Sequence, residues 1–302
     1  MDLKAAAIDI GTNSCRLLIG EKNSNNSFNI LVREVEITRL GEGVDENKNL
    51  NKSAVKRVEA ALKKYKNIIE KYEVEKVRII GTSALRDVNN SDLLAESIEK
   101  MGFKLEIISG EEEAELNYLG ASSNLEANFL LIDIGGGSTE FIWANQNKIN
   151  FKSLDIGCVR LTERFIDSPA KKVSAKEIEN IKKYVENLLK SSLKLKQNFR
   201  IKGVGGTITT LAAIKLELTE YLSEKIENLE ITKIELEQII SKLTELKLEK
   251  RAMIKGLQAK RADIIVAGLI ILNSILDYFG SENLVVSDQD LLYGLLKEEL
   301  VN

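Results

Sequence analysis

Two carboxylates on either side of a glycine run have the type and spacing of a metal and phosphate site. Asp133 ends the apolar run 129–132, glycines follow at 135–137, and Glu140 comes after a hydroxyl pair at 138–139. A turn of glycines presents backbone N–H groups that no Cβ shields, so it can donate several hydrogen bonds to a phosphate. Because a hard cation prefers oxygen ligands, the two acids predict a Mg²⁺ site beside that phosphate. An ordinary Gly-rich hairpin turn is the alternative interpretation.

The same pattern occurs at the start of the chain. The apolar residues 5–8 lead into Asp9, Ile10 and Gly11, and small polar residues follow at 12–14. Such a repeat indicates two similar domains, and we expect each to offer one phosphate loop to a shared cleft. Asp9 holds the place of Asp133 in the repeat and is therefore a third candidate metal ligand.

An α/β fold is expected to position these residues. A buried helix is predicted near the C-terminus, and an amphipathic helix is predicted from Asn51 to about Tyr72. A domain boundary is expected at about 120–128. It would divide the chain into domains 1–122 and 123–302, with a terminal helix that could pack back on the first domain. The predicted strands are 3–10, 15–20, 28–38, 77–80, 105–108, 129–132, 138–145, 148–154, 201–204 and 284–286.

One glutamate in the first half is the candidate general base. Ser109 and Glu112 have the spacing of a capping box, which places Glu113 in the first turn of a helix. Helix N-termini favour negative charge, so we expect Glu113 to be ionised and able to accept a proton. The alternative is that Glu113 belongs to a solvated acidic face, because acids also stand at 111, 112 and 115.

Composition excludes several kinds of enzyme. The 302 residues include no histidine, so a Ser-His-Asp triad, a Cys-His pair and HExxH zinc chemistry are all absent. The chain has no Gly-Lys dipeptide and therefore no Walker P-loop. Two cysteines, the absence of a recognisable signal peptide and a net charge of −3 predict a cytoplasmic protein without nucleic-acid or membrane partners.

Eight segments of the chain are distinctive in combination. They are IDIGTNS (8–14), RLGEGVD (39–45), TSALR (82–86), ISGEEEA (108–114), IDIGGGSTE (132–140), VRLTERF (159–165), VGGTITTLAA (204–213) and RADII (261–265). In this order and at these spacings they resemble the Ppx/GppA family of exopolyphosphatases and guanosine pentaphosphate phosphohydrolases. The resemblance covers nearly the whole chain.

The resemblance implies two actin-like (ribonuclease H-like) domains and hydrolysis of a terminal phosphoryl group with Mg²⁺ or Mn²⁺. It implies that Glu113 is the catalytic glutamate and that Asp133 and Glu140 bind the metal; Asp9 is added from the repeat. Arg86 is implied to contact substrate, although a structural ion pair with Asp87 or a neighbour is the alternative. The predicted phosphate-binding residues are Gly11, Thr12, Asn13, Ser14, Arg86, Gly135, Gly136, Gly137, Ser138 and Thr139. We add Gly206 and Thr207, which form a further glycine-bearing turn. The alternative is that packing requires the glycines of that turn.

The expected activity is an exopolyphosphatase acting on inorganic polyphosphate. A guanosine pentaphosphate (pppGpp) phosphohydrolase is the alternative, followed by a small-molecule kinase of the same superfamily and a non-catalytic relative. A homodimer is also considered. A chain of this length without histidine resembles the short form, which lacks a His-Asp domain.

The chain departs from the family pattern near its C-terminus, and the role of one cationic segment is not determined by the sequence. Asp290 and Leu292 replace the glycine and arginine of the pattern V-S-D-x-G-L-R-x-G. A cationic segment could line a path for a polyanion or consist of exposed helix charges, which we favour. Its members are Lys250, Arg251, Lys255, Lys260 and Arg261.

Overall fold

The computed structural model describes residues 3–23, 27–121, 129–145, 148–195 and 199–301. It divides into two compact units, the first formed by Met1–Ser123 with Gln289–Asn302 and the second by Asn124–Asp288. Of the predicted boundary at about 120–128, residues 122–128 lie outside the described residues. Each unit is considered by itself below.

The first unit is built on a five-stranded mixed sheet. Its strands are β1 (Lys4–Ile10), β2 (Ser14–Lys22), β3 (Phe28–Ile37), β4 (Lys76–Gly81) and β5 (Leu105–Ile107). Its helices are α1 (Val44–Asn47), α2 (Lys52–Lys71), α3 (Ser83–Arg86), α4 (Asp92–Lys100), α5 (Gly110–Ala121) and α13 (Leu291–Leu300). The order is β3-β2-β1-β4-β5, with β1 antiparallel to β2 and parallel to β4.

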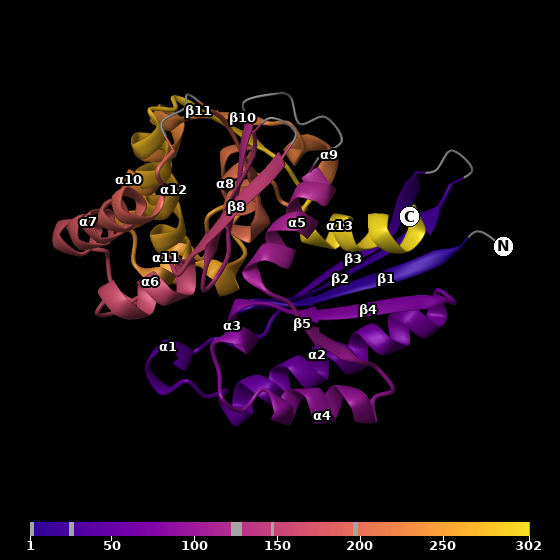
Figure 1. Ribbon diagram of the computed structural model, residues 1–302. Coiled ribbons are helices and arrows are strands. Elements are labelled where there is room, and N and C mark those ends of the chain that lie inside the picture. Colours follow the sequence, from indigo (N-terminus) through magenta and orange to yellow (C-terminus); the bar gives the residue numbers. More distant parts are fainter. Residues whose placement is uncertain (1–2, 24–26, 122–128, 146–147, 196–198, 302) are drawn as a thin grey trace. The chain divides into compact units, whose positions relative to one another are not determined.

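The two faces of β1 pack against different helices, because side chains alternate along a strand. Ala6, Ile8 and Ile10 belong to a core that includes α2 and α4. Ala5 and Ala7 point the other way, into a core formed with α5 and α13. Figure 1 shows α2 and α4 on one side of this sheet and α13 on the other. By the same alternation, Asp9 lies on the side of α5 and α13.

The second unit repeats the strand arrangement of the first. Its strands are β6 (Phe129–Ile134), β7 (Thr139–Asn145), β8 (Lys148–Leu154), β9 (Arg200–Val204), β10 (Glu230–Thr232) and β11 (Asn283–Val286), in the order β10-β11-β9-β6-β7-β8. From β8 inward, the order and directions of β8-β7-β6-β9-β11 match β3-β2-β1-β4-β5, and β10 is an added antiparallel edge strand. Two mixed sheets with helices packed on them confirm the predicted α/β fold.

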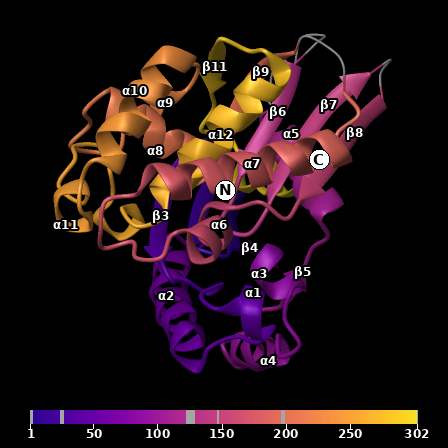
Figure 2. The same cartoon turned by 90° about the vertical axis from the view of Figure 1, so that its left-hand side faces the viewer.

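Helices cover one face of the second sheet. They are α6 (Cys158–Phe165), α7 (Ala175–Ser192), α8 (Gly205–Lys215), α9 (Ser223–Ile226), α10 (Lys233–Thr244), α11 (Leu248–Arg251), a 3₁₀ turn (Ala259–Arg261) and α12 (Ile265–Phe279). Leu130, Ile132 and Ile134 of β6 share a core with α7, α8, α10 and α12, and Figure 2 shows α7 beside α12. No helix in the described ranges is long and apolar enough to cross a membrane.

Close packing of α13 against α5 depends on glycine. A Cβ on Gly294 would overlap the carbonyl oxygen of Leu116, and a Cβ on Gly120 would overlap that of Asp290. Backbone atoms cannot yield as a flexible side chain can, so the helices would have to separate.

Gly294→Ala should therefore lower the free energy of unfolding by about 1–3 kcal/mol, the usual cost of overpacking. Urea unfolding measures the change, with Glu298→Ala, a partly exposed residue of the same helix, as the control. A Gly294→Ala midpoint equal to that of the wild type would contradict the close approach.

Candidate functional site

A single hydrogen bond closes the first predicted phosphate loop. The Gly11 N–H donates to the Ser14 carbonyl oxygen at 2.9 Å. The register of β1 and β2 then sets Asp9 directly opposite Arg16. The loop is thus a tight hairpin whose acid faces a cation on the neighbouring strand.

The turn after β3 donates hydrogen bonds to the backbone of this loop. The N–H groups of Thr38 and Arg39 donate to the Asn13 carbonyl oxygen at 3.1 and 2.9 Å, and the Gly41 N–H donates to that of Thr12 at 2.8 Å. A Cβ on Gly41 would overlap the Thr12 side chain. Through these contacts the segment 39–45 holds the backbone of the first loop in place. They satisfy its carbonyl oxygens, whereas the N–H groups of residues 12 and 13 have no acceptor within the described ranges.

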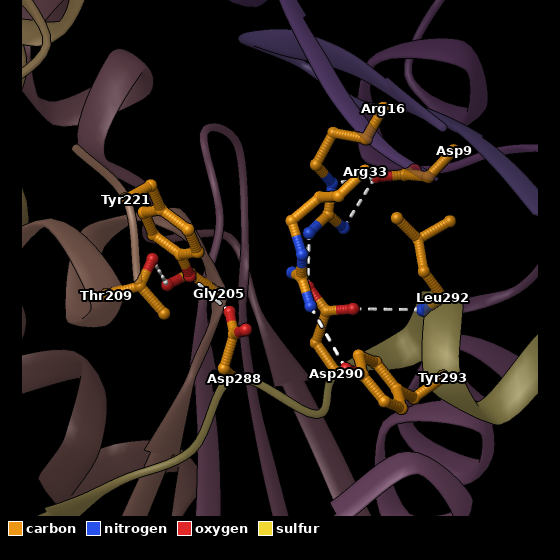
Figure 3. A network of polar contacts seen from close by, with 10 residues as sticks. All are labelled: Asp9, Arg16, Arg33, Gly205, Thr209, Tyr221, Asp288, Asp290, Leu292 and Tyr293. Atoms are coloured by element: carbon orange, nitrogen blue, oxygen red, sulfur yellow. Dashed lines mark hydrogen bonds and ion pairs between the residues drawn. The ribbon is translucent and has the colours of Figure 1, made fainter. Parts of the chain in front are cut away.

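Arg16 joins two carboxylates in the first unit. Its Nε and Nη2 donate to Asp9 Oδ2 at 2.9 and 2.7 Å, and its Nη1 pairs with Asp290 (Figure 3). Burial raises the pKa of Asp9, and the charge and hydrogen bonds of Arg16 offset this only in part. Asp9 Oδ1 and Asn13 Nδ2 are buried and have no hydrogen-bond partner among the described residues. A cation would satisfy the first atom and an anion the second.

The candidate base is fixed at the start of α5. The predicted capping box is confirmed, since Ser109 N–H donates to Glu112 at 2.7 Å and Glu112 N–H donates to the Ser109 hydroxyl at 3.1 Å. Glu113 is only 8% exposed, whereas the acids at 111, 112 and 115 are exposed. Glu113 therefore does not belong to the solvated acidic face.

Arg86, the last residue of α3, holds Glu113. Its Nη1 donates to Glu113 Oε2 at 2.7 Å and to the Ile108 carbonyl oxygen at 3.1 Å. Its Nε and Nη2 have no partner in the part of the chain that the structure describes. The expected structural ion pair thus exists, with Glu113 rather than Asp87, and the guanidinium edge formed by Nε and Nη2 stays available for a phosphate.

The second loop repeats the first. The Gly135 N–H donates to the Ser138 carbonyl oxygen at 3.0 Å, and Asp133 stands opposite Glu140. Glu140 is fully buried and accepts a 2.7 Å hydrogen bond from the Ser153 hydroxyl of β8. In the first unit the residue opposite the aspartate is Arg16, whereas in the second unit it is a second carboxylate, Glu140.

The N-terminus of α6 supports the second loop. The N–H groups of Cys158 and Val159 donate to the carbonyl oxygens of Gly135 and Gly136 at 3.0 and 2.9 Å. Arg160 Nε donates to the third glycine carbonyl oxygen, at residue 137, at 2.8 Å. The N–H groups of residues 136 and 137 have no acceptor in the described ranges, as at residues 12 and 13 of the first loop. Both loops thus present two adjacent N–H donors.

The predicted turn at Gly206 and Thr207, at the start of α8, contacts the second loop. Gly205 has a φ of +86°, and a Cβ there would overlap Asp133 Oδ1. A Cβ on Gly206 would overlap the guanidinium of Arg261. Packing therefore does require these glycines, and it brings the start of α8 against the acid of the second loop.

Comparison with known proteins decides the family. The chain matches the Ppx/GppA phosphatase family over residues 18–302. It belongs to this family. The "Bifunctional 3-dehydroquinate synthase/phosphatase" of Fusobacterium nucleatum is 40% identical over 98% of this chain, which spans 46% of that relative's length. "Exopolyphosphatase 2" of Mycobacterium tuberculosis is 33% identical over 97% of both chains.

Solved structures agree with this assignment. The Ppx/GppA family member of Aquifex aeolicus is 30% identical, covers 100% of this chain and 98% of its own, and superposes with a TM-score of 0.82. The predicted family and fold are thus confirmed. The predicted enzyme class, a phosphoric anhydride hydrolase, agrees with the Ppx/GppA name and with the names of these relatives.

One side-chain prediction, that of Arg251, needs correction, and two predicted phosphate-binding residues use their hydroxyls for other contacts. The Thr139 hydroxyl donates to the Ile156 carbonyl oxygen at 2.5 Å and the Thr207 hydroxyl to that of Ile134 at 3.1 Å, so both hydroxyls hold the backbone together. Arg251 was favoured as an exposed helix charge, yet it is fully buried and donates to the carbonyl oxygens of Leu243, Leu246 and Ala262.

Four residues that lie against the loops are not among the predicted site residues: Arg16, Arg160, Arg261 and Asp290. Hairpin register could have paired Arg16 with Asp9, because both flank the same turn. The other three reach the loops from segments distant in sequence, and no local pattern indicates that.

Asp9→Asn tests the cost of burying this charge. The folded-state pKa of Asp9 lies above its usual 3.8 because of burial, so the ionised carboxylate destabilises the fold above that folded pKa and costs nothing below 3.8. In metal-free buffer at neutral pH, Asp9→Asn should have a higher Tm than the wild type. The difference should shrink as the pH falls.

Thermal unfolding from neutral to acidic pH measures this effect. Asp92→Asn, which removes an exposed carboxylate, is the control. A lower Tm for Asp9→Asn at neutral pH would mean that the Arg16 pair outweighs desolvation.

Proposed function

We propose that this chain hydrolyses the terminal anhydride bond of inorganic polyphosphate and releases orthophosphate. The observation that carries the proposal is the pair of the buried Glu113 and the partly buried Arg86, held at 2.7 Å in the same unit as the first loop. A carboxylate base and an arginine with spare donors suit attack by water on a phosphate. The relatives named exopolyphosphatases favour polyphosphate as the substrate.

Phosphate binding is assigned to backbone groups first. Each loop offers two adjacent N–H groups without an acceptor in the described ranges, at residues 12 and 13 and at residues 136 and 137. Successive N–H groups in a turn form an anion-binding concavity. Arg86 adds its Nε and Nη2, which can pair bidentately with one phosphate. Side-chain hydroxyls of Thr139 and Thr207 are not part of this assignment.

Glu113 is assigned as the general base. Its carboxylate would take a proton from water while the water oxygen bonds to the terminal phosphorus. The bond from that phosphorus to the bridging oxygen breaks, and the shortened polyphosphate leaves with the electron pair. Arg86 fixes the orientation of Glu113, and no histidine in the chain could replace it.

The acids of each loop, taken unit by unit, are the candidate ligands of a divalent cation. In the first unit the buried Asp9 Oδ1 lacks a partner among the described residues, and in the second unit Asp133 and Glu140 stand opposite each other. We propose these three residues as ligands of Mg²⁺ or Mn²⁺, directly or through water. When bound, the cation would neutralise charge on the phosphate oxygens.

One other substrate and one other reaction are open to test. The terminal linkage of pppGpp is also a phosphoric anhydride, so the same groups could act on it. A kinase would instead pass the phosphate to an acceptor such as ADP, and the base in the same unit as the first loop favours water as the acceptor.

Glu113→Gln should lower kcat for phosphate release by about 10²-fold or more, since the amide keeps the Arg86 contact but cannot take the proton. Polyphosphate affinity, measured by calorimetry, should stay unchanged. Glu111→Gln, two residues earlier in the same helix and exposed, should retain full activity. The role is refuted if Glu113→Gln keeps more than about a tenth of the wild-type kcat.

Asp133→Asn and Glu140→Gln should each raise the Mg²⁺ concentration needed for half-maximal rate by about 10-fold or more. The physical reason is the loss of an anionic ligand charge. Asp155→Asn removes an exposed carboxylate of the same unit and serves as the control. Any variant that reproduces the wild-type Mg²⁺ titration does not replace a metal ligand.

A further inference from the structure

Asp290 occupies a position with two separate contacts. One carboxylate oxygen, Oδ1, accepts the Leu292 N–H at 3.0 Å and so caps α13. The other, Oδ2, pairs with Arg16 Nη1. The residue is 6% exposed. Capping needs only an oxygen, whereas the pair with Arg16 uses the negative charge.

The backbone at Asp290 is fixed independently of that charge. Gly120 of α5 packs directly on the Asp290 carbonyl oxygen, and Gly294 packs on Leu116 one turn further along α13. Lys297 also donates to the carbonyl oxygens of Leu119 and Gly120 at 2.7 and 3.0 Å. A substitution that keeps the cap should therefore leave the side chain at this place in the fold.

Charge balance at the first loop depends on Asp290. Arg16 directs Nε and Nη2 at Asp9 Oδ2 and Nη1 at Asp290 (Figure 3). With both acids ionised, the three groups carry a net charge of about −1; without the Asp290 charge, the pair of Asp9 and Arg16 would be neutral. A neutral pair attracts a cation much less than an anionic group does.

We propose that Asp290 is a positioning residue that shares Arg16 with Asp9 and thereby sets the affinity of the first loop for a divalent cation. It acts through Arg16 and does not contact the cation. The inference rests on the proposed metal dependence and assigns a determinant of it to the N-cap of α13, a position outside both loops. The alternative is that Asp290 only caps the helix.

Asp290→Asn separates these roles, because asparagine is as good an N-cap as aspartate but carries no charge. Calorimetric titration with Mn²⁺ alone, without substrate, should show a Kd about 3- to 10-fold weaker than that of the wild type. The Mg²⁺ concentration for half-maximal phosphate release should rise in parallel. Asp290→Ser, a second uncharged cap, should behave alike and serves if Asp290→Asn does not fold.

Glu298→Gln is the matched control, since it removes a carboxylate from the same helix that pairs with Arg78 instead. It should leave the Mn²⁺ Kd unchanged. Equal Mn²⁺ affinity for Asp290→Asn and the wild type overturns the inference but leaves the proposed hydrolysis intact. A wild-type protein that releases phosphate but binds no Mn²⁺ refutes both the inference and the proposed metal site.

Discussion

A hydrogen bond from a glycine N–H to the carbonyl oxygen three residues later determines the geometry of both loops. It occurs at Gly11 and again at Gly135, at 2.9 and 3.0 Å. A turn closed in this way fixes the hairpin register, and a slip of one residue would move every side chain to the other face. Asp9 therefore meets Arg16, and Asp133 meets Glu140. The two units share one backbone design and differ in the charge placed opposite the acid.

The buried carboxylate of Asp9 in the first loop destabilises the fold that holds it. Burial raises the pKa of Asp9 in spite of Arg16, so the folded chain holds this carboxylate at a cost to its stability. Such costs are usual at active sites, where charges fixed in advance need no reorganisation when the substrate binds. Glu113, held by Arg86 at 2.7 Å, belongs to the same arrangement in the first unit.

Sequence was informative where the chemistry is local and uninformative where it depends on packing. Asp9, Asp133 and the capping box before Glu113 could be found because each marks a strand end or a helix start. The sequence does not indicate in which direction a hydroxyl points. In the structure the hydroxyls of Thr139 and Thr207 donate to backbone carbonyl oxygens. The role of Asp290 likewise depends on the register of α13 against α5, which no short pattern encodes.

Phosphate release measured side by side on short polyphosphate, pppGpp and ATP, each with and without ADP, tests most directly whether water attacks a polyphosphate end. The account predicts that phosphate accumulates fastest from polyphosphate and that its release does not require ADP. Phosphate that appears only as newly formed ATP in the presence of ADP would show transfer to an acceptor and contradict hydrolysis. Faster release from pppGpp would contradict the assigned substrate.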